Sequence, residues 1–247
     1  MTSSASTITE STEPQSGSLY VVSTPIGNLE DITFRAIRIL RGVNLVVAED
    51  TRVTRILLRH YSINIECLSC NAHNERSRIP VVLERLQRGD SIAVVSDAGT
   101  PGISDPAAVL ISSVIEAGYP VIPIPGACAA LAALVTSGMT MDRFHFEGFL
   151  PVKKRRKTRI QELALEHRTI ILYESVHRIS KTLTELQSAF GDRRVSVSRE
   201  LTKKFEETIR GTIGEVMTNL LNRPPRGEFV IVIEGRQDET QTHFPEV

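Results

Sequence analysis

Short β-type runs alternate with helical patterns along this 247-residue chain, and this alternation restricts the possible folds more than any other feature. In the first half, the runs LYVVST, NLVVA, IECLS, SIAVVS and PVIPI are rich in Val and Ile, which favour strands. The segments between them place apolar residues three and four apart, as helices do. This order predicts a largely parallel sheet that is covered by helices on both faces.

The second half alternates in the same way but with fewer helices. TIILYE, RRVSVSRE and EFVIVIEG predict strands, and FEETIRG is a further candidate, so we expect a mixed sheet here. The expected fold is α/β with two α/β domains, at 19–125 and 151–236, joined by a connector at 126–150. The Ser- and Thr-rich segment 1–18 is expected to be a disordered tail, and 237–247 a second tail.

The composition excludes several classes of protein. No run approaches eighteen apolar residues, and the N-terminus lacks the basic start and apolar middle of a signal peptide. We therefore expect a cytoplasmic protein with no membrane contact. Cys67, Cys70 and His73 could supply only three of the four ligands that a structural zinc ion takes, and Cys128 lies far along the chain, so no metal is expected.

The formal net charge of zero hides an uneven distribution. Residues 89–142 contain five acidic side chains and no Lys, Arg or His, whereas all six lysines lie at or beyond Lys153. The cation-free region includes SDAGTPGISDP, Ser96 to Pro106, a glycine-rich turn between a predicted strand and a predicted helix. This turn fits neither the P-loop nor the dinucleotide fingerprint.

A ligand of this turn should be neutral or cationic, because no side-chain cation is near in sequence. Glycine and alanine leave the main chain approachable, which suits a nucleoside without phosphates. S-adenosylmethionine has this chemistry: a nucleoside with a sulfonium cation. The alternative is that the turn only connects a strand to a helix.

Several motifs together resemble the tetrapyrrole methylase superfamily, the class III methyltransferases. They are STPIGNLEDIT, VVAEDTR, HNE and VSDAGTPGISDP, and PIPGA, FEGFLP, YESVHR and RGEFVIVIEG narrow the resemblance. The narrower match is to the branch that methylates the ribose 2′-oxygen of a cytidine in 16S rRNA, and it runs from about Leu19 to Gly235. The resemblance implies S-adenosylmethionine in a cleft between two α/β domains, a homodimer, and the small ribosomal subunit as partner.

The resemblance also implies site residues. The expected cofactor-binding residues are Pro25, Asp97, Ala98, Gly99, Thr100, Ile103, Cys128, Ala129, Glu174, Leu201 and Phe229. A ribose hydroxyl is a poor nucleophile near neutral pH, so a general base should assist. The candidates for this base are Glu174 and His177 of YESVHR, where Glu174 could orient His177, and Glu49 and Asp50 of VAEDTR. His177 could equally cap a helix.

Clustered cations follow GFLP, and such clusters neutralise RNA phosphates. The expected substrate-binding residues are Lys153, Lys154, Arg155, Arg156 and Lys157, together with Glu49, Asp50 and Arg52 of VAEDTR. The basic cluster could instead be a solvated helix start, and Glu49, Asp50 and Arg52 a salt-bridged strand end. Three other functions stay open: tetrapyrrole methylation, which would not need the basic cluster, a ribosome assembly factor without catalysis, and an NAD-binding dehydrogenase.

Overall fold

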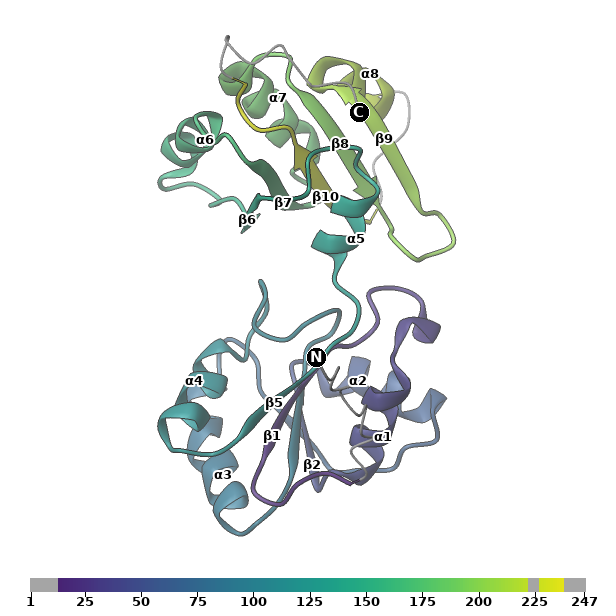
Figure 1. Ribbon diagram of the computed structural model, residues 1–247, viewed down its shortest axis with the longest axis vertical. Helices are drawn as coiled ribbons and strands as arrows, with labels where there is room; N and C mark the ends of the chain where they lie inside the picture. The colour runs from purple at the N-terminus through teal and green to yellow at the C-terminus, as the bar shows by residue number, and fades with distance from the viewer. Residues whose placement is uncertain (1–12, 222–226, 238–247) are drawn as a thin grey trace, which may run out of the picture. The chain divides into compact units, whose positions relative to one another are not determined.

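The chain folds into two compact units in a computed structural model that describes residues 13–221 and 227–237 (Figure 1). The first unit contains the chain up to Thr24 and Ile32–Gly126. The second contains Pro25–Asp31 and the chain from Ala127 onward. A seven-residue segment near the N-terminus therefore belongs with the second unit, which the sequence did not predict.

The first unit is built on a five-stranded sheet in the order β3-β2-β4-β1-β5. Every neighbouring pair is parallel, which confirms the prediction of a parallel sheet. The strands are β1 (Leu19–Val22), β2 (Leu45–Ala48), β3 (Cys67–Ser69), β4 (Ile92–Val95) and β5 (Val121–Ile124).

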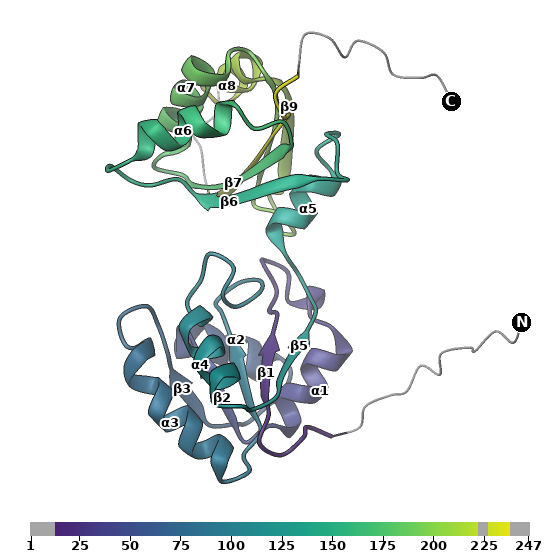
Figure 2. The ribbon, with the colours of Figure 1, turned by 60° about the vertical axis from the view of Figure 1, so that its left-hand side comes forward.

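Four helices cover both faces of this sheet, as predicted (Figure 2). They are α1 (Phe34–Gly42), α2 (Thr51–His60), α3 (Glu75–Gln87) and α4 (Ala108–Glu116). Val82, Leu86 and Leu110 bring α3 and α4 into one core with β1, β2 and β4. Helices α1 and α2 lie on the opposite face (Figure 2). Thr33 begins α1, where its hydroxyl accepts a hydrogen bond from Ala36 N at 3.1 Å.

The second unit has a sheet in the order β6-β7-β10-β8-β9. Only β6 and β7 are parallel and the other pairs are antiparallel, so the predicted mixed sheet is confirmed. The strands are β6 (Phe144–Phe149), β7 (Thr169–Ser175), β8 (Arg194–Arg199), β9 (Glu207–Thr212) and β10 (Glu228–Ile233).

The two faces of the second sheet are covered differently. Helices α6 (Arg156–Ala164), α7 (Ile179–Phe190) and α8 (Ile213–Leu221) share a large core with one face, through residues such as Leu183 and Ile231. The short helix α5 (Ala129–Val135) packs against Ile171, Val230 and Val232 on the other face. Residues next to each other on a strand therefore face different surroundings.

Three segments differ from the expectations or fall outside the description. Residues 126–150, expected as a connector, contain α5 and the edge strand β6. Residues 13–18 belong to the expected tail, yet Ser18 is buried and Gly17 N donates to Gly89 O at 3.1 Å. The expected tails at 1–12 and 238–247 lie outside the described residues. Among the helices of residues 13–221 and 227–237, none is long and apolar enough to cross a membrane.

Candidate functional site

The glycine-rich turn after β4 is fastened to the end of β1. Thr24 and Gly99 exchange two main-chain hydrogen bonds, of 2.8 and 3.1 Å, and the Ser23 and Thr100 hydroxyls lie 2.9 Å apart. Gly99 has φ +85° and Gly102 has φ +83°, a backbone region that L side chains rarely adopt. The glycines are therefore required by the shape of the turn.

The far end of the same turn is held by the HNE motif. Glu75 is 9% exposed, and its Oε1 accepts hydrogen bonds from Ala107 N and Leu110 N, both at 3.0 Å. Ala107 precedes α4 and has φ +101°, so a side chain from α3 supplies the cap that Ala107 cannot provide. Glu75 thus fixes where the turn ends and α4 begins.

Three carboxylates line the edge of the first sheet where β2 and β4 end. Asp50 N donates to Asp97 Oδ1 at 3.0 Å, and Asp97 N donates to Glu49 Oε2 at 3.3 Å. Partial burial raises the pKa of Glu49 and of Asp97. Asp50 differs, because hydrogen bonds from Arg52 lower its pKa to about 2. We call Glu49, Asp50 and Asp97 the acidic edge.

The chemistry of this region fits a cationic nucleoside better than a phosphate. The cation-free stretch 89–142 includes the whole turn, and the acidic edge adds negative charge beside it. Ala98 is exposed and Ile103 is 45% exposed. A Cβ added at Gly102 would meet nothing closer than 3.8 Å, so the main chain there is open to a ligand. A cationic nucleoside, such as the methyl donor that the resemblance implies, is compatible with these features.

Of the predicted cofactor residues in the second unit, several lie around α5. Cys128 precedes this helix, Ala129 is its first residue, and both pack with Leu201 in the cluster on the α5 face. Ile26, the neighbour of Pro25, joins the same cluster. The structure therefore brings this part of the predicted set together.

Glu174 and Phe229 lie elsewhere. They are opposite each other on β7 and β10, and Phe229 packs into the core on the α6–α8 face. The Glu174 side chain is fully buried and contacts Thr182 of α7 on that same face. Their side chains are thus separated by the sheet from Cys128 and Ala129.

The hydrogen bonds of Glu174 give it a role different from the predicted one. Its oxygens accept from Ser175 N at 2.8 Å, Arg178 Nε at 2.7 Å, Arg178 Nη2 at 3.1 Å and Thr182 Oγ1 at 2.6 Å. Glu174 therefore orients Arg178 rather than His177, because the carboxylate is already occupied by these donors. His177 is exposed in the turn between β7 and α7.

The basic cluster forms a fixed turn between β6 and α6. Arg178 Nη2 donates to Leu150 O at 3.1 Å, and Arg156 Nη1 donates to Pro151 O at 3.2 Å. Arg155 adopts φ +64° immediately before α6. Lys153, Lys154, Arg155 and Lys157 are exposed. We call Lys153–Arg155 with Lys157 the basic loop.

Arg156 departs from the expectation that every residue of the cluster meets the substrate. It is 6% exposed, and it donates to Glu185 Oε2 at 2.7 Å and to Thr182 Oγ1 at 2.6 Å. The reason is its place on the first turn of α6, on the face that packs against α7. Arg156 therefore anchors the basic loop to α7 through buried hydrogen bonds.

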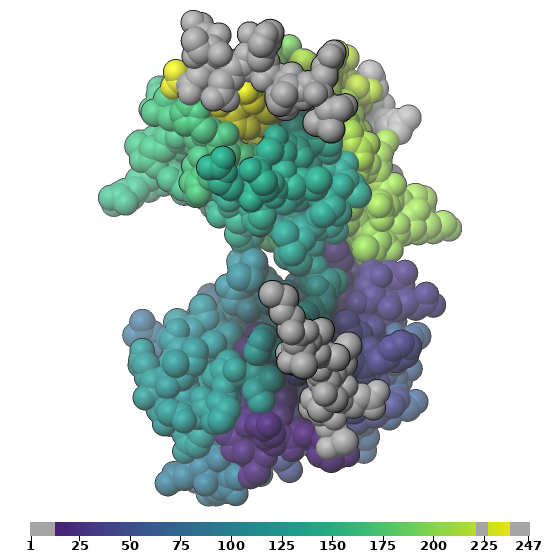
Figure 3. Space-filling view, in the orientation of Figure 1, coloured from purple at the N-terminus to yellow at the C-terminus, as the bar shows by residue number. Residues whose placement is uncertain are grey.

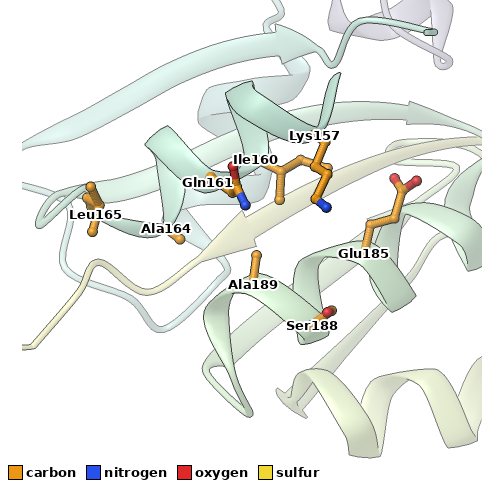
Figure 4. Close-up of a pocket in the computed structure, with 8 residues that line it drawn as sticks. All are labelled: Lys157, Ile160, Gln161, Ala164, Leu165, Glu185, Ser188 and Ala189. Carbon is orange, nitrogen blue, oxygen red and sulfur yellow. The ribbon is translucent and has the colours of Figure 1, made fainter. Parts of the chain in front are cut away.

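Helices α6 and α7 also enclose a groove of about 520 Å³ (Figure 4). Its lining is Lys157, Ile160, Gln161, Ala164, Leu165, Glu185, Ser188 and Ala189. Only Lys157 among these belongs to the predicted site residues, so the groove is not the predicted cofactor site.

Cys67 and Cys70 hold their thiols in partly or fully buried positions. Burial raises the pKa of Cys67, and it raises the pKa of Cys70 to about 11, which favours unreactive thiols. Within the described ranges, no three His, Cys, Asp or Glu residues are placed to hold a metal ion.

Sequence reasoning missed the positioning residues. The sequence indicates Glu75 only as part of the HNE motif, and it gives no signal for Thr182. The signal available for Glu75 was an acidic residue at a predicted helix start, which is also typical of ordinary helices. Its partners Ala107 and Leu110 are more than thirty residues away in sequence.

Comparison with known proteins gives consistent matches. The family model described as Tetrapyrrole (Corrin/Porphyrin) Methylases matches residues 18–217. A Synechocystis protein named Ribosomal RNA small subunit methyltransferase I is 50% identical over 93% of this chain and 83% of its own length. A Bacillus subtilis protein of the same name is 47% identical over 90% of this chain and 77% of its own length.

Solved structures resemble the chain in fold. Cobalt precorrin-4 methyltransferase, a cobalamin biosynthetic enzyme, has a TM-score of 0.64 at 19% identity over 88% of this chain and 95% of its own. The methyltransferase CobJ has a TM-score of 0.65 at 19% identity over 90% and 97%.

Proposed function

The chain belongs to the tetrapyrrole methylase family, and on that premise we propose that it is a methyltransferase of small-subunit ribosomal RNA. The proposal rests on relatives that share about half of its residues over most of their length and carry that name. We further propose that the acceptor is the ribose 2′-oxygen of a cytidine in 16S rRNA.

The turn at Asp97–Ile103 is proposed to bind S-adenosylmethionine. When bound, the donor supplies a methyl group made electrophilic by its sulfonium. The carboxylates of the acidic edge favour that positive charge, and the main chain at Gly102, where an added Cβ would meet nothing closer than 3.8 Å, can meet the nucleoside. Thr24 and Glu75 hold the two ends of the turn, so the donor-binding surface is formed before the donor arrives.

Pro25, Cys128, Ala129 and Leu201 remain proposed cofactor contacts. For Glu174 and Phe229 a contact could come only from the main chain, because both side chains pack into the α6–α8 core. His177 remains the proposed proton acceptor, since its imidazole is exposed in the turn between β7 and α7 and an imidazole nitrogen can act as a general base.

The basic loop is proposed to bind RNA phosphates. Four exposed cations, three on a turn fixed by Arg156 and Arg178 and one on the first turn of α6, offer a compact positive surface. Glu49, Asp50 and Arg52 are proposed to meet the substrate from the first unit. Replacing Lys153 by Gln should reduce the slope of log affinity against log salt by about one. Lys181→Gln is the matched control, because Lys181 is a 70% exposed lysine on α7.

The first experiment tests donor, acceptor and reaction together. Small ribosomal subunits from cells lacking this protein are incubated with the purified chain and tritiated S-adenosylmethionine. We expect label in 16S rRNA at one cytidine that resists alkaline cleavage, because a 2′-O-methyl group blocks that cleavage. Label on a base, or label only on a tetrapyrrole acceptor, would contradict the proposal.

Two finer expectations accompany this activity. We propose a homodimer, which sedimentation velocity would report as twice the mass of the 27.3 kDa chain. We also propose a cytoplasmic location, where small subunits are assembled.

A further inference from the structure

The loop between β8 and β9 presents an aromatic ring to solvent. Phe205 lies in this loop and is 69% exposed, although burial of a phenyl ring normally stabilises a fold. Lys204 Nζ lies 5.6 Å from the centre of the ring, within the range of a cation–π contact. Figure 3 shows the loop region, in yellow-green, as a projection on the surface of the second unit.

The loop is held in an unusual shape. Glu200 has φ +48° and Thr202 has φ +65°, so two non-glycine residues adopt the left-handed region within three positions. Such conformations persist only where the surrounding structure imposes them, and they cluster at functional sites. The loop shape is therefore built into the fold, although a simple hairpin connection would not need it.

Side chains on both ends of the loop impose that shape. Thr202 N donates to Glu206 Oε2 at 2.6 Å, and Lys203 Nζ donates to Glu200 Oε1 at 2.9 Å. A third tie comes from the distant TPIGN segment, where Asn28 N donates to Thr202 Oγ1 at 3.1 Å. A Cβ added at Gly27 would lie 2.5 Å from Lys203 Cγ, so this segment packs closely on the loop.

We propose that Phe205 is a stacking platform for a nucleobase of the substrate RNA, with Lys204 binding the adjoining phosphate. This inference rests on the proposed function and adds a contact outside the basic loop. Proteins that bind single-stranded RNA combine aromatic rings, on which bases stack, with nearby cations. A ring fixed in an exposed position loses little freedom when a base stacks on it.

The ring can be tested with substitutions that separate stacking from simple apolar contact. Phe205→Ala should weaken binding to unmethylated small subunits by roughly 5- to 150-fold, as loss of one base stack does. Phe205→Tyr should restore most of the affinity, whereas Phe205→Leu should not, because leucine has no π face. Phe34→Ala is the matched control: Phe34 is 92% exposed at the start of α1 and should leave affinity unchanged.

A direct signal is available because the chain contains no tryptophan. Phe205→Trp places a single indole in the loop, and its fluorescence should be quenched when an unmodified small-subunit rRNA transcript binds. Phe34→Trp should show no quenching at the same saturation. Lys204→Gln should reduce the salt slope of binding by about one. Titration with S-adenosylmethionine, expected to be unchanged, verifies that each variant is folded.

The outcomes separate the two proposals. If the wild-type protein methylates subunits and Phe205→Ala binds them equally well, the stacking inference is wrong and the proposed function stands. If Phe205→Ala changes the oligomeric state in sedimentation velocity and leaves RNA affinity intact, the ring belongs to a contact between copies and the inference is also overturned. A wild-type protein that neither binds nor methylates subunits overturns both.

Discussion

Both units place carboxylates at strand ends: the first has the acidic edge, and the second has Glu174 with its hydrogen-bond partners. The surroundings of these carboxylates differ. Glu49 and Asp97 are bonded to main-chain N–H groups, and partial burial raises their pKa values. Glu174 is surrounded by two arginines, Arg178 at 2.7 Å and Arg156 at 4.0 Å. In the acidic edge Arg52 pairs with Asp50, and Glu49 accepts only from a main-chain N–H group, whereas the charge of Glu174 is balanced by two arginines.

This difference suits two kinds of work. Glu49, whose described contacts include no cationic side chain, can attract a positively charged ligand to the glycine-rich turn beside it. A carboxylate saturated by arginines cannot do this, but it can fix the arginines and the loop that they hold. Binding and positioning thus use the same residue type with different partners.

The largest expected effect comes from removing the buried carboxylate. Glu174→Ala should lower the free energy of unfolding by about 3–5 kcal/mol, because it leaves the Arg178 and Arg156 guanidinium groups without their buried anion. Urea denaturation followed by circular dichroism measures the change, and hydrogen exchange should locate it at β7 and α7. Lys181→Ala, which removes an exposed ion pair with Glu185, should change the free energy by less than about 0.5 kcal/mol. Equal effects of the two variants would contradict the positioning role of Glu174.

A smaller effect is expected from the cap of α4. Glu75→Ala leaves Ala107 N and Leu110 N without their acceptor and should cost about 2–3 kcal/mol in the free energy of unfolding. It should also weaken S-adenosylmethionine binding in calorimetry, because the turn loses its fixed end. Glu84→Ala is the control on the same helix, since Glu84 is 60% exposed and pairs only with Arg88 among the described contacts. A stable Glu75→Ala protein with unchanged donor affinity would contradict this account.

The smallest effect is a pH dependence of opposite sign in the two units. The raised pKa of Glu49 means that the folded chain holds its proton more tightly than the unfolded chain, whose carboxyl titrates near about 4.3. Its contribution to stability is therefore present at low pH and lost as pH rises through the folded pKa. As pH falls from 7 to 4, the free energy of unfolding of the wild type should rise relative to that of Glu49→Gln. The rise should be about 1 kcal/mol or less, since partial exposure screens the effect.

Glu147 of β6 provides the comparison for this titration. Hydrogen bonds from Arg159 lower its pKa, so its contribution is present above about pH 4.3 and is lost as pH falls through the folded pKa. As pH falls over the same interval, the free energy of unfolding of the wild type should therefore decrease relative to that of Glu147→Gln. Urea denaturation at several pH values measures both differences, and parallel curves for the two variants would refute the distinction.

Local pattern was enough to predict the architecture. Val- and Ile-rich runs separated by three- and four-residue apolar spacing indicated both the parallel sheet and the mixed sheet, because burial on two faces leaves that signature. Strand β6 was not predicted. It lies at a sheet edge, and the polar residues His145 and Glu147 within it make its sequence look like a polar connector. The bond from His145 to Glu147, at 3.0 Å, stabilises this edge and is not visible in sequence.

The candidate site was predictable where chemistry follows from neighbours in sequence. The glycines of the turn and the absence of cations from its sequence are read directly, and the main chain of the turn is open at Gly102. Which face of β7 carries Glu174, and which side of α6 carries Arg156, depends on packing against α7. A run of five basic residues looks uniform in sequence, yet one of the five is buried.

The placement of Pro25–Asp31 in the second unit has a consequence for synthesis on the ribosome. Asn28 bonds to Thr202, 174 positions later, so the segment leaves the ribosome long before its partner exists. At about 5–20 residues per second, roughly 9–35 s separate the two. During that interval the first unit can assemble its sheet around β1, whereas Pro25–Asp31 still lacks the partner that it contacts in the folded chain. Completion of the β8–β9 loop is therefore a late event that depends on nearly the whole chain having been translated.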